Sequence, residues 1–154
     1  MIKVLKYQES INASADRVYR TMLGLDNPKT YAEWTYEFNP TSQVKGTWEK
    51  GSKMYFVGVD ENGKEGGMVS VIAENDPAKF VSIKHIGMLD GTNEITEGPE
   101  VESWAGAMEN YSFEEKNGQT IVSVETGSTE DHFDYFDEAW PKALTKLKEM
   151  CEKN

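Results

Sequence analysis

Apolar side chains near the C-terminus recur with the spacing of an α-helix. Steps of three, four, four, three and four residues keep them on one face: Phe133, Phe136, Trp140, Leu144, Leu147 and Cys151. A face that carries two Phe and one Trp has to be buried, and the strand-like segments before it offer a sheet. The pattern therefore predicts one long C-terminal helix packed on a β-sheet.

Two features describe this helix further. The hydroxyl and acidic residues at 128–131 predict its start, because they suit a helix N-terminus. Pro141 lies inside the stripe, where it removes a backbone donor and clashes with the carbonyl four residues earlier. Because the stripe keeps its phase through Pro141, we expect one helix with a kink at Trp140–Pro141, not two helices.

The preceding segments alternate between strand and helix patterns. Residues 2–11 predict a first strand, and two short helices follow, one capped by Ser14 and one that starts near Pro28 and carries Trp34. Six further strands are predicted by runs of β-branched and aromatic residues at 41–49, 53–60, 65–75, 79–88, 103–115 and 119–126. The order predicts an α+β fold, in which a curved antiparallel sheet of about seven strands wraps the C-terminal helix.

Turn signals separate these strands. Asn62-Gly63 and Asn117-Gly118 predict tight hairpins, and we interpret Gly66 and Gly67 as turn glycines beside the first of them. The longest irregular segment is 89–102, which we expect to be a loop.

Composition and charge narrow the class of protein. The chain has 154 residues, the size of one domain, so residues 1–154 are expected to form a single unit. Sixteen basic and 27 acidic residues give a net charge of −11, which argues against nucleic-acid and anionic-membrane partners. One cysteine and an N-terminus without an apolar secretion signal indicate a cytoplasmic protein.

Several segments together resemble a known superfamily. They are Ile11–Tyr19, Trp34, Gly51-Ser52-Lys53, Glu109–Phe113 and Trp140–Lys148. In this order the chain resembles the helix-grip fold of the START-like, or SRPBCC, superfamily. It is most similar to bacterial relatives of the C-terminal domain of the activator of the ninety-kilodalton heat-shock protein ATPase. The resemblance implies a pocket between sheet and helix, in a superfamily whose members bind lipids, hormones and polyketides, and some of which catalyse cyclisation or dehydration.

Candidate chemistry is sparse. His85 and His132 lack a metal-ligand framework, and we predict no metal site, no cofactor and no catalytic residue. His85 is interpreted either as a hydrogen-bonded core residue or as a polar anchor in a pocket. The aromatic residues either fill the core or border a cavity, with Trp34 and the 89–102 loop near its mouth. The candidate lining is Trp34, Phe56, His85, Trp104, Tyr111, Phe133, Phe136 and Trp140.

Three functions follow from these observations. The first is non-catalytic binding of a small hydrophobic or amphipathic molecule, lipid-like or aromatic, between the sheet and the last helix. The alternative is a protein-interaction module that docks on a chaperone, as the resemblance implies. An enzyme that uses the pocket as a reaction chamber ranks last, because no acid–base pair stands out in the sequence.

Overall fold

A computed structural model describes residues 2–153 and contains one curved antiparallel sheet. Its strands run in the spatial order β1-β8-β7-β5-β4-β3-β2, and β6 pairs with β5 beside this path. The strands are β1 (Lys3–Ile11), β2 (Gln43–Lys45), β3 (Lys53–Val59), β4 (Glu65–Asp76), β5 (Phe80–Asp90), β6 (Asn93–Ile95), β7 (Met108–Lys116) and β8 (Gln119–Ser128). The predicted α+β class is confirmed.

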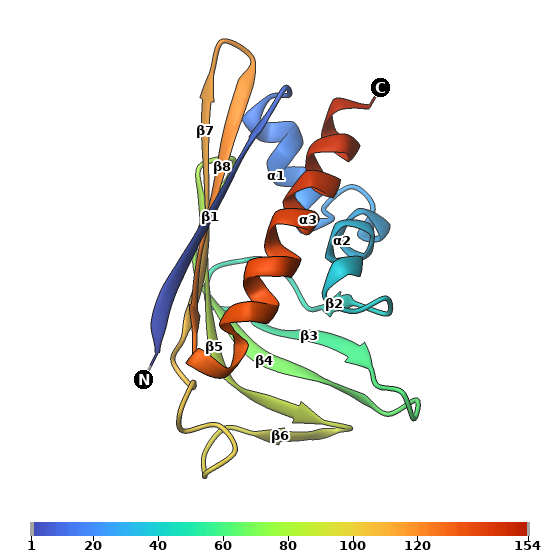
Figure 1. Cartoon of the computed structure of the whole chain (residues 1–154), viewed down its shortest axis with the longest axis vertical. Coiled ribbons are helices and arrows are strands. Elements are labelled where there is room, and N and C mark those ends of the chain that lie inside the picture. The colour runs from blue at the N-terminus through green and yellow to red at the C-terminus, as the bar shows by residue number, and fades with distance from the viewer. Residues whose placement is uncertain (1, 154) are drawn as a thin grey trace.

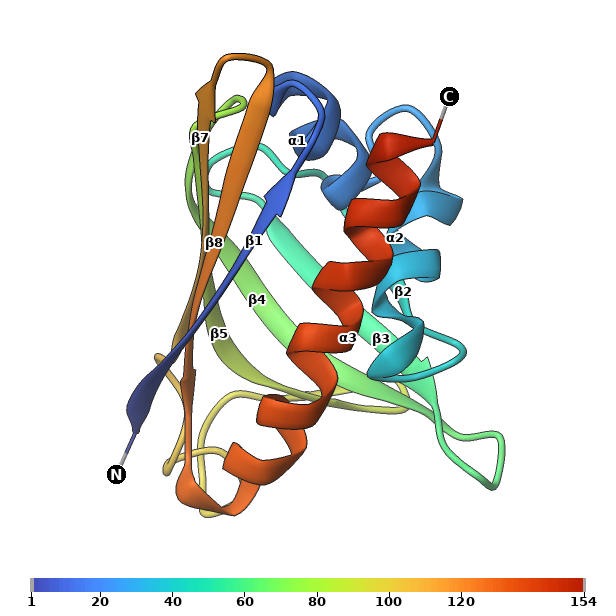
Figure 2. The same cartoon turned by 45° about the horizontal axis from the view of Figure 1, so that its top comes forward.

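Three α-helices lie on one side of this sheet (Figure 1). They are α1 (Ala15–Leu23), α2 (Pro28–Trp34) and α3 (Phe133–Glu152), with short 3₁₀ turns at η1 (Thr35–Glu37) and η2 (Glu130–His132). Figure 2 shows the sheet bending around α3, while α1 and α2 lie beside it. Sheet and helices together form the predicted grip on the last helix. None of the helices in residues 2–153 is long and apolar enough to cross a membrane.

The predicted helix caps are in place. Ser14 accepts a hydrogen bond from the backbone N–H of Arg17 at 3.2 Å, and Gly24 ends α1 in the left-handed conformation at φ 69°. Asn27 caps α2 with Pro28 in its first turn. The last helix is a single element that continues through Pro141, as predicted, although it starts at Phe133 after the 3₁₀ turn η2.

The predictions for three segments were wrong in detail. The 89–102 segment is not wholly irregular, because the chain turns back at Gly91, with φ 63°, and pairs β6 with the end of β5. With β6, residues 2–153 form eight strands, close to the predicted number of about seven. The predicted strand 103–115 begins only at Met108, since residues 101–106 form turns that end at Gly106 with φ 94°. The segment 41–49 contributes only the three residues of β2.

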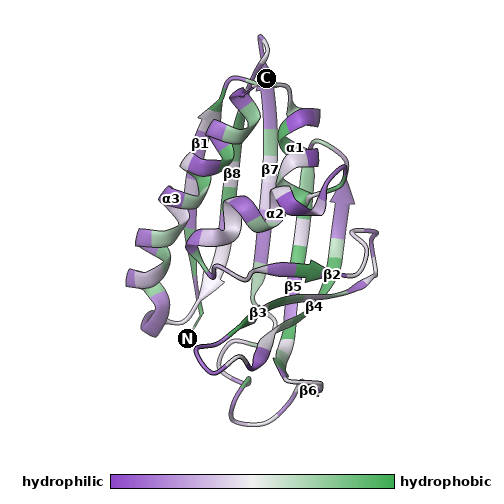
Figure 3. Ribbon diagram, turned by 90° about the vertical axis from the view of Figure 1, so that its right-hand side faces the viewer, coloured by the Kyte–Doolittle hydropathy of each residue, from purple (hydrophilic) through white to green (hydrophobic). Residues whose placement is uncertain are grey.

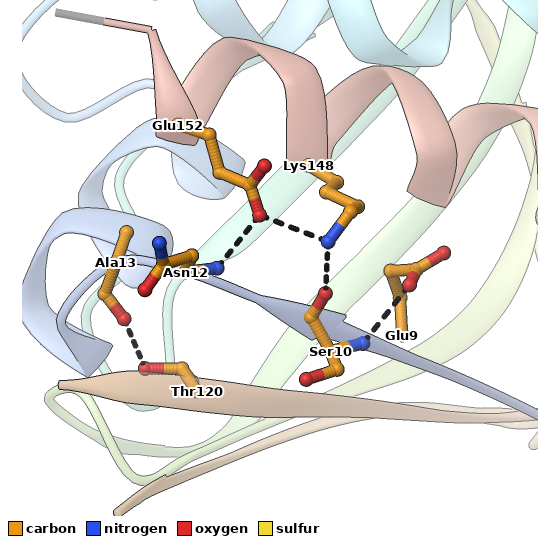
Figure 4. A network of polar contacts seen from close by, with 7 residues as sticks. All are labelled: Glu9, Ser10, Asn12, Ala13, Thr120, Lys148 and Glu152. Atoms are coloured by element: carbon orange, nitrogen blue, oxygen red, sulfur yellow. Dashed lines mark hydrogen bonds and ion pairs between the residues drawn. The ribbon is translucent and has the colours of Figure 1, made fainter. Parts of the chain in front are cut away.

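The core lies between the concave face of the sheet and α3. Figure 3 shows α3 alternating between hydrophilic and hydrophobic residues along its length. Its stripe is buried from Ala139 to Cys151, whereas Phe133 and Phe136 are only partly buried. Hydrogen bonds fix the C-terminal end of the helix to β1 (Figure 4), where Lys148 Nζ donates to the Ser10 carbonyl at 2.8 Å. The opposite half of α3, around Phe136, is therefore the part that can border an open space.

Candidate functional site

A cavity of about 610 Å³ lies between the sheet and the N-terminal half of α3. Its walls come from α2, η1, β3, β4, β5, β7 and α3. Ligand pockets in proteins commonly measure about 300 to 1,000 Å³, so this space has the size of a small-molecule site. The buried residues Trp34, His85, Tyr111 and Trp140 form its inner end.

Six of the eight predicted lining residues meet at this cavity: Trp34, Phe56, His85, Tyr111, Phe136 and Trp140. Trp104 does not, because β7 starts after it and its indole N–H donates to the Glu100 carbonyl within a surface turn, at 3.1 Å. Phe133 does not either, since it is the first residue of α3 and lies one turn beyond the cavity wall. Of the 89–102 segment, only Leu89 and Asp90 reach the lining.

Glycines that we interpreted as turn residues belong to the cavity wall. Gly66 and Gly67 lie within β4, and Gly66 faces Gly58 across the β3–β4 ladder. All three line the cavity, and a Cβ at Gly58 would lie 2.5 Å from Nδ2 of Asn39. Gly67 has φ 155°, and a Cβ there would lie 1.9 Å from the Phe56 carbonyl oxygen, so no side chain fits. Counting outward from a two-residue turn at Asn62-Gly63 would have paired Gly58 with Gly67, whereas the structure pairs Gly58 with Gly66, so the sequence did not reveal this register.

Aromatic rings make the inner wall. Trp140 packs against Trp34 at 5.8 Å and against Phe38 at 4.9 Å between ring centroids, and Tyr31 packs against Phe56 at 6.2 Å. Sequence reasoning missed Tyr31 and Phe38, although both stand in the same aromatic segment as Trp34. These contacts fix the rings in place and present their faces and edges to the cavity.

A chain of polar side chains crosses this aromatic wall. Ser70 Oγ lies 2.7 Å from Nδ1 of His85, and Nε2 of His85 lies 3.0 Å from Oε1 of Glu109. The Tyr111 hydroxyl donates to Oε2 of the same carboxylate. The His85 side chain is 7% exposed and that of Glu109 is 19% exposed. Ser70 is buried outside the lining and supports His85 from behind, whereas the other three members border the cavity.

The environment keeps two phenols of this site in their neutral form. Burial raises the pKa of Tyr111 well above its ordinary value, and the negative charge of Glu109 raises it further. Burial and the same carboxylate also raise the pKa of Tyr31, whereas a side-chain hydrogen bond with Ser42 lowers it by a smaller amount. Both hydroxyls therefore remain protonated at neutral pH and can act as hydrogen-bond donors.

The rim of the cavity carries exposed charges. Lys64 forms an ion pair with Asp90, and Glu65 pairs with Lys45 at 3.0 Å. Tyr135, at the start of α3, donates from its hydroxyl to the Phe38 carbonyl at 2.9 Å and so joins the helix to the segment after η1. Residues 2–153 contain no group of three His, Cys, Asp or Glu side chains placed to hold a metal ion.

Comparison with known proteins identifies the fold. A scan against protein-family models finds no match, and a search of curated proteins finds none. Among solved structures, the Aha1 dimer from Colwellia psychrerythraea is similar with a TM-score of 0.69 and 23% identity, covering 97% of this chain and 96% of that one. Protein NE0264 from Nitrosomonas europaea gives a TM-score of 0.70 at 16% identity, covering 96% and 92%. CalU16 from Micromonospora echinospora gives 0.64 at 14%, covering 97% and 74%.

These likenesses extend over nearly the whole chain. The protein has a helix-grip fold, as the sequence resemblance predicted. The presence of Aha1 among its structural neighbours agrees with the resemblance to relatives of the heat-shock protein ATPase activator, at the level of the fold. Because one fold supports many functions, the cavity and not the fold has to carry the functional argument.

Proposed function

We propose that the protein binds a small hydrophobic or amphipathic molecule in the cavity between the sheet and α3, without chemical conversion of that molecule. The cavity of about 610 Å³ is the observation that carries this proposal. Most of its inner wall is aromatic, and the polar side chains are few and grouped at one place. Small-molecule sites commonly combine an apolar wall with a few polar groups that orient the ligand.

A titration followed by two-dimensional amide NMR tests the proposal. We would add a panel of fatty acids, sterols and flavonoids and look for saturable shifts in β3, β4 and the first half of α3. A Met68→Trp variant should abolish these shifts, because Met68 lines the cavity and indole would occupy it. Met68→Leu is the matched control, since it conserves volume and should leave binding intact. A flat response of the wild type across the panel would contradict the proposal.

Docking on a chaperone stays a prediction. The similarity to Aha1, at 23% identity, is a similarity of fold and does not indicate which surface of this chain would contact a chaperone. A pull-down with the cognate chaperone would test it directly, and retention of the chaperone by the Met68→Trp variant would separate such docking from occupancy of the cavity.

A further inference from the structure

Charges in the cavity are unevenly distributed. Four of its lining residues are acidic (Asp60, Glu65, Asp90 and Glu109), and one, Lys64, is basic. The rim charges are exposed to solvent and partly paired with lysines, so water and salt screen them. Glu109 is different, because its side chain is 19% exposed and lies at the inner, aromatic end. This carboxylate therefore dominates the electrostatics that a bound molecule would meet.

Glu109 is incompletely satisfied by its neighbours. His85 occupies one acceptor position on Oε1, and Tyr111 occupies one on Oε2. A carboxylate offers about four acceptor positions, so two remain for a group inside the cavity. A ligand hydroxyl or amine could donate to them, whereas a ligand carboxylate would bring a second negative charge into a poorly solvated place.

From this arrangement we infer that the cavity selects ligands whose polar end is a hydrogen-bond donor, a hydroxyl or an amine on an aromatic or alicyclic body, and rejects carboxylates. The inference rests on the proposed function, since it names the chemical class of the molecule bound there. Glu109 accepts a hydrogen bond from the ligand's donor group, while Tyr111 and His85 fix the position of the carboxylate. The aromatic rings contact the apolar body of the ligand. An amine would add attraction to the ring faces, which favour cations.

Three naphthalene probes that share one apolar body test the selectivity. They are 2-naphthalenemethanol, 2-naphthylmethylamine and 2-naphthoate, which are neutral, cationic and anionic at pH 7. Isothermal titration calorimetry should show the alcohol and the amine binding at least about tenfold tighter than the acid. The alcohol and the amine each form a hydrogen bond to the charged Glu109 carboxylate, whereas the carboxylate of naphthoate is repelled by it. Comparison of alcohol with amine distinguishes a neutral from a cationic donor.

Two variants assign the selectivity to one residue. Glu109→Gln removes the charge and retains the shape, so the preference for the donors over naphthoate should fall to within about threefold. Glu114→Gln makes the same substitution at an exposed position of the same strand, β7, outside the cavity, and should change each affinity by less than about twofold. Circular dichroism and the amide spectrum check that both variants fold. The order of the three probe affinities is measured on the wild type, so it stays informative even if a variant fails to fold.

The outcomes separate the inference from the proposed function. If naphthoate binds the wild type as tightly as the alcohol, the selectivity is overturned while binding stands. If the preference persists in Glu109→Gln, the role of Glu109 is overturned. If no probe binds the wild type and the wider panel also gives no shifts, both the cavity function and the selectivity fail.

Discussion

The indole rings of Trp34 and Trp140 pack against each other at 5.8 Å, yet only one of their N–H groups is hydrogen-bonded. Trp34 Nε1 donates to the carbonyl of Met22 at 2.8 Å, and this carbonyl belongs to the last turn of α1, where no intrahelical partner exists. The Trp140 Nε1 atom is buried and has no hydrogen-bond partner among residues 2–153. Trp34 therefore supplies a hydrogen bond to the end of α1 as well as packing, whereas Trp140 supplies packing alone.

This asymmetry predicts different costs for one substitution. Trp34→Phe should lower the free energy of unfolding by about 1 to 3 kcal/mol more than Trp140→Phe, because it leaves a buried carbonyl without a partner. Both changes remove a similar part of a buried ring, so their difference isolates the hydrogen bond. Denaturant unfolding followed by far-ultraviolet circular dichroism measures it. Equal losses in the two variants would contradict the assignment.

The pair formed by His85 and Glu109 predicts a coupled loss of stability. His85→Leu should lower the free energy of unfolding by about 3 kcal/mol, since it strands a poorly solvated carboxylate. The double variant His85→Leu, Glu109→Gln should lose less than the sum of the single losses by at least about 1 kcal/mol. Lys6→Ala, which breaks an exposed ion pair with Glu125, serves as control and should cost at most about 1 kcal/mol. Additive losses at His85 and Glu109 would show that the contact contributes nothing.

Much of the architecture could be predicted from local patterns. The stripe from Phe133 to Cys151 predicted α3, because a helical spacing over six apolar residues has no other explanation in a globular chain. The two-residue hairpin at Asn117-Gly118 was right, because both residues have positive φ, at 57° and 78°, and Lys116 pairs with Gln119. A hairpin also forms at Asn62-Gly63, but only Gly63 has positive φ there, and the pairing of Val59 with Glu65 makes its loop longer than two residues. These features depend on neighbours in sequence.

The site was harder to predict because it depends on which face of each strand points inward. Trp104 was assigned to the lining on the assumption that its strand began at 103, whereas the chain there is a turn. The contact between His85 and Glu109 joins residues 24 positions apart and runs diagonally between β5 and β7, because Glu109 pairs in the ladder with Ile83, two residues before His85. No local pattern specifies that contact, since strands that are apolar on both faces leave the register undetermined.

The polar contacts of Glu152 at the C-terminal end of α3 predict a pH-dependent contribution to stability. Glu152 accepts the backbone N–H of Asn12 at 2.8 Å and pairs with Lys148 at 2.9 Å (Figure 4). The Asn12 hydrogen bond, together with Lys148, lowers the pKa of Glu152 below its ordinary value. A lowered folded pKa gives stability that is present above the unfolded pKa, about 4.3 for Glu, and is lost as pH falls through the folded pKa.

Glu152→Gln should therefore be less stable than the wild type at pH 7, and this difference should shrink as the pH falls below about 4. Denaturant unfolding at a series of pH values between neutral and acid measures both proteins. Glu149→Gln provides the control, because Glu149 lies on the exposed side of the same helix. A difference at Glu152 that stays constant down to the acid end of the series would contradict the assignment.

Pro141 leaves a gap in the hydrogen bonding of α3, and filling this gap should stabilise the protein. Pro141 is exposed and lies inside the helix, where its ring nitrogen cannot donate to the carbonyl of Asp137 four residues earlier. Pro141→Ala should raise the free energy of unfolding by about 1 to 3 kcal/mol, since it restores that donor and replaces the poorest helix former with the best. Thr145→Ala, one turn later at an exposed position, is the control for helix propensity alone and should gain at most about 0.7 kcal/mol. A gain at Pro141 no larger than at Thr145 would mean that α3 accommodates the proline without strain, and that the stripe through Trp140 alone sets the path of the helix over the cavity.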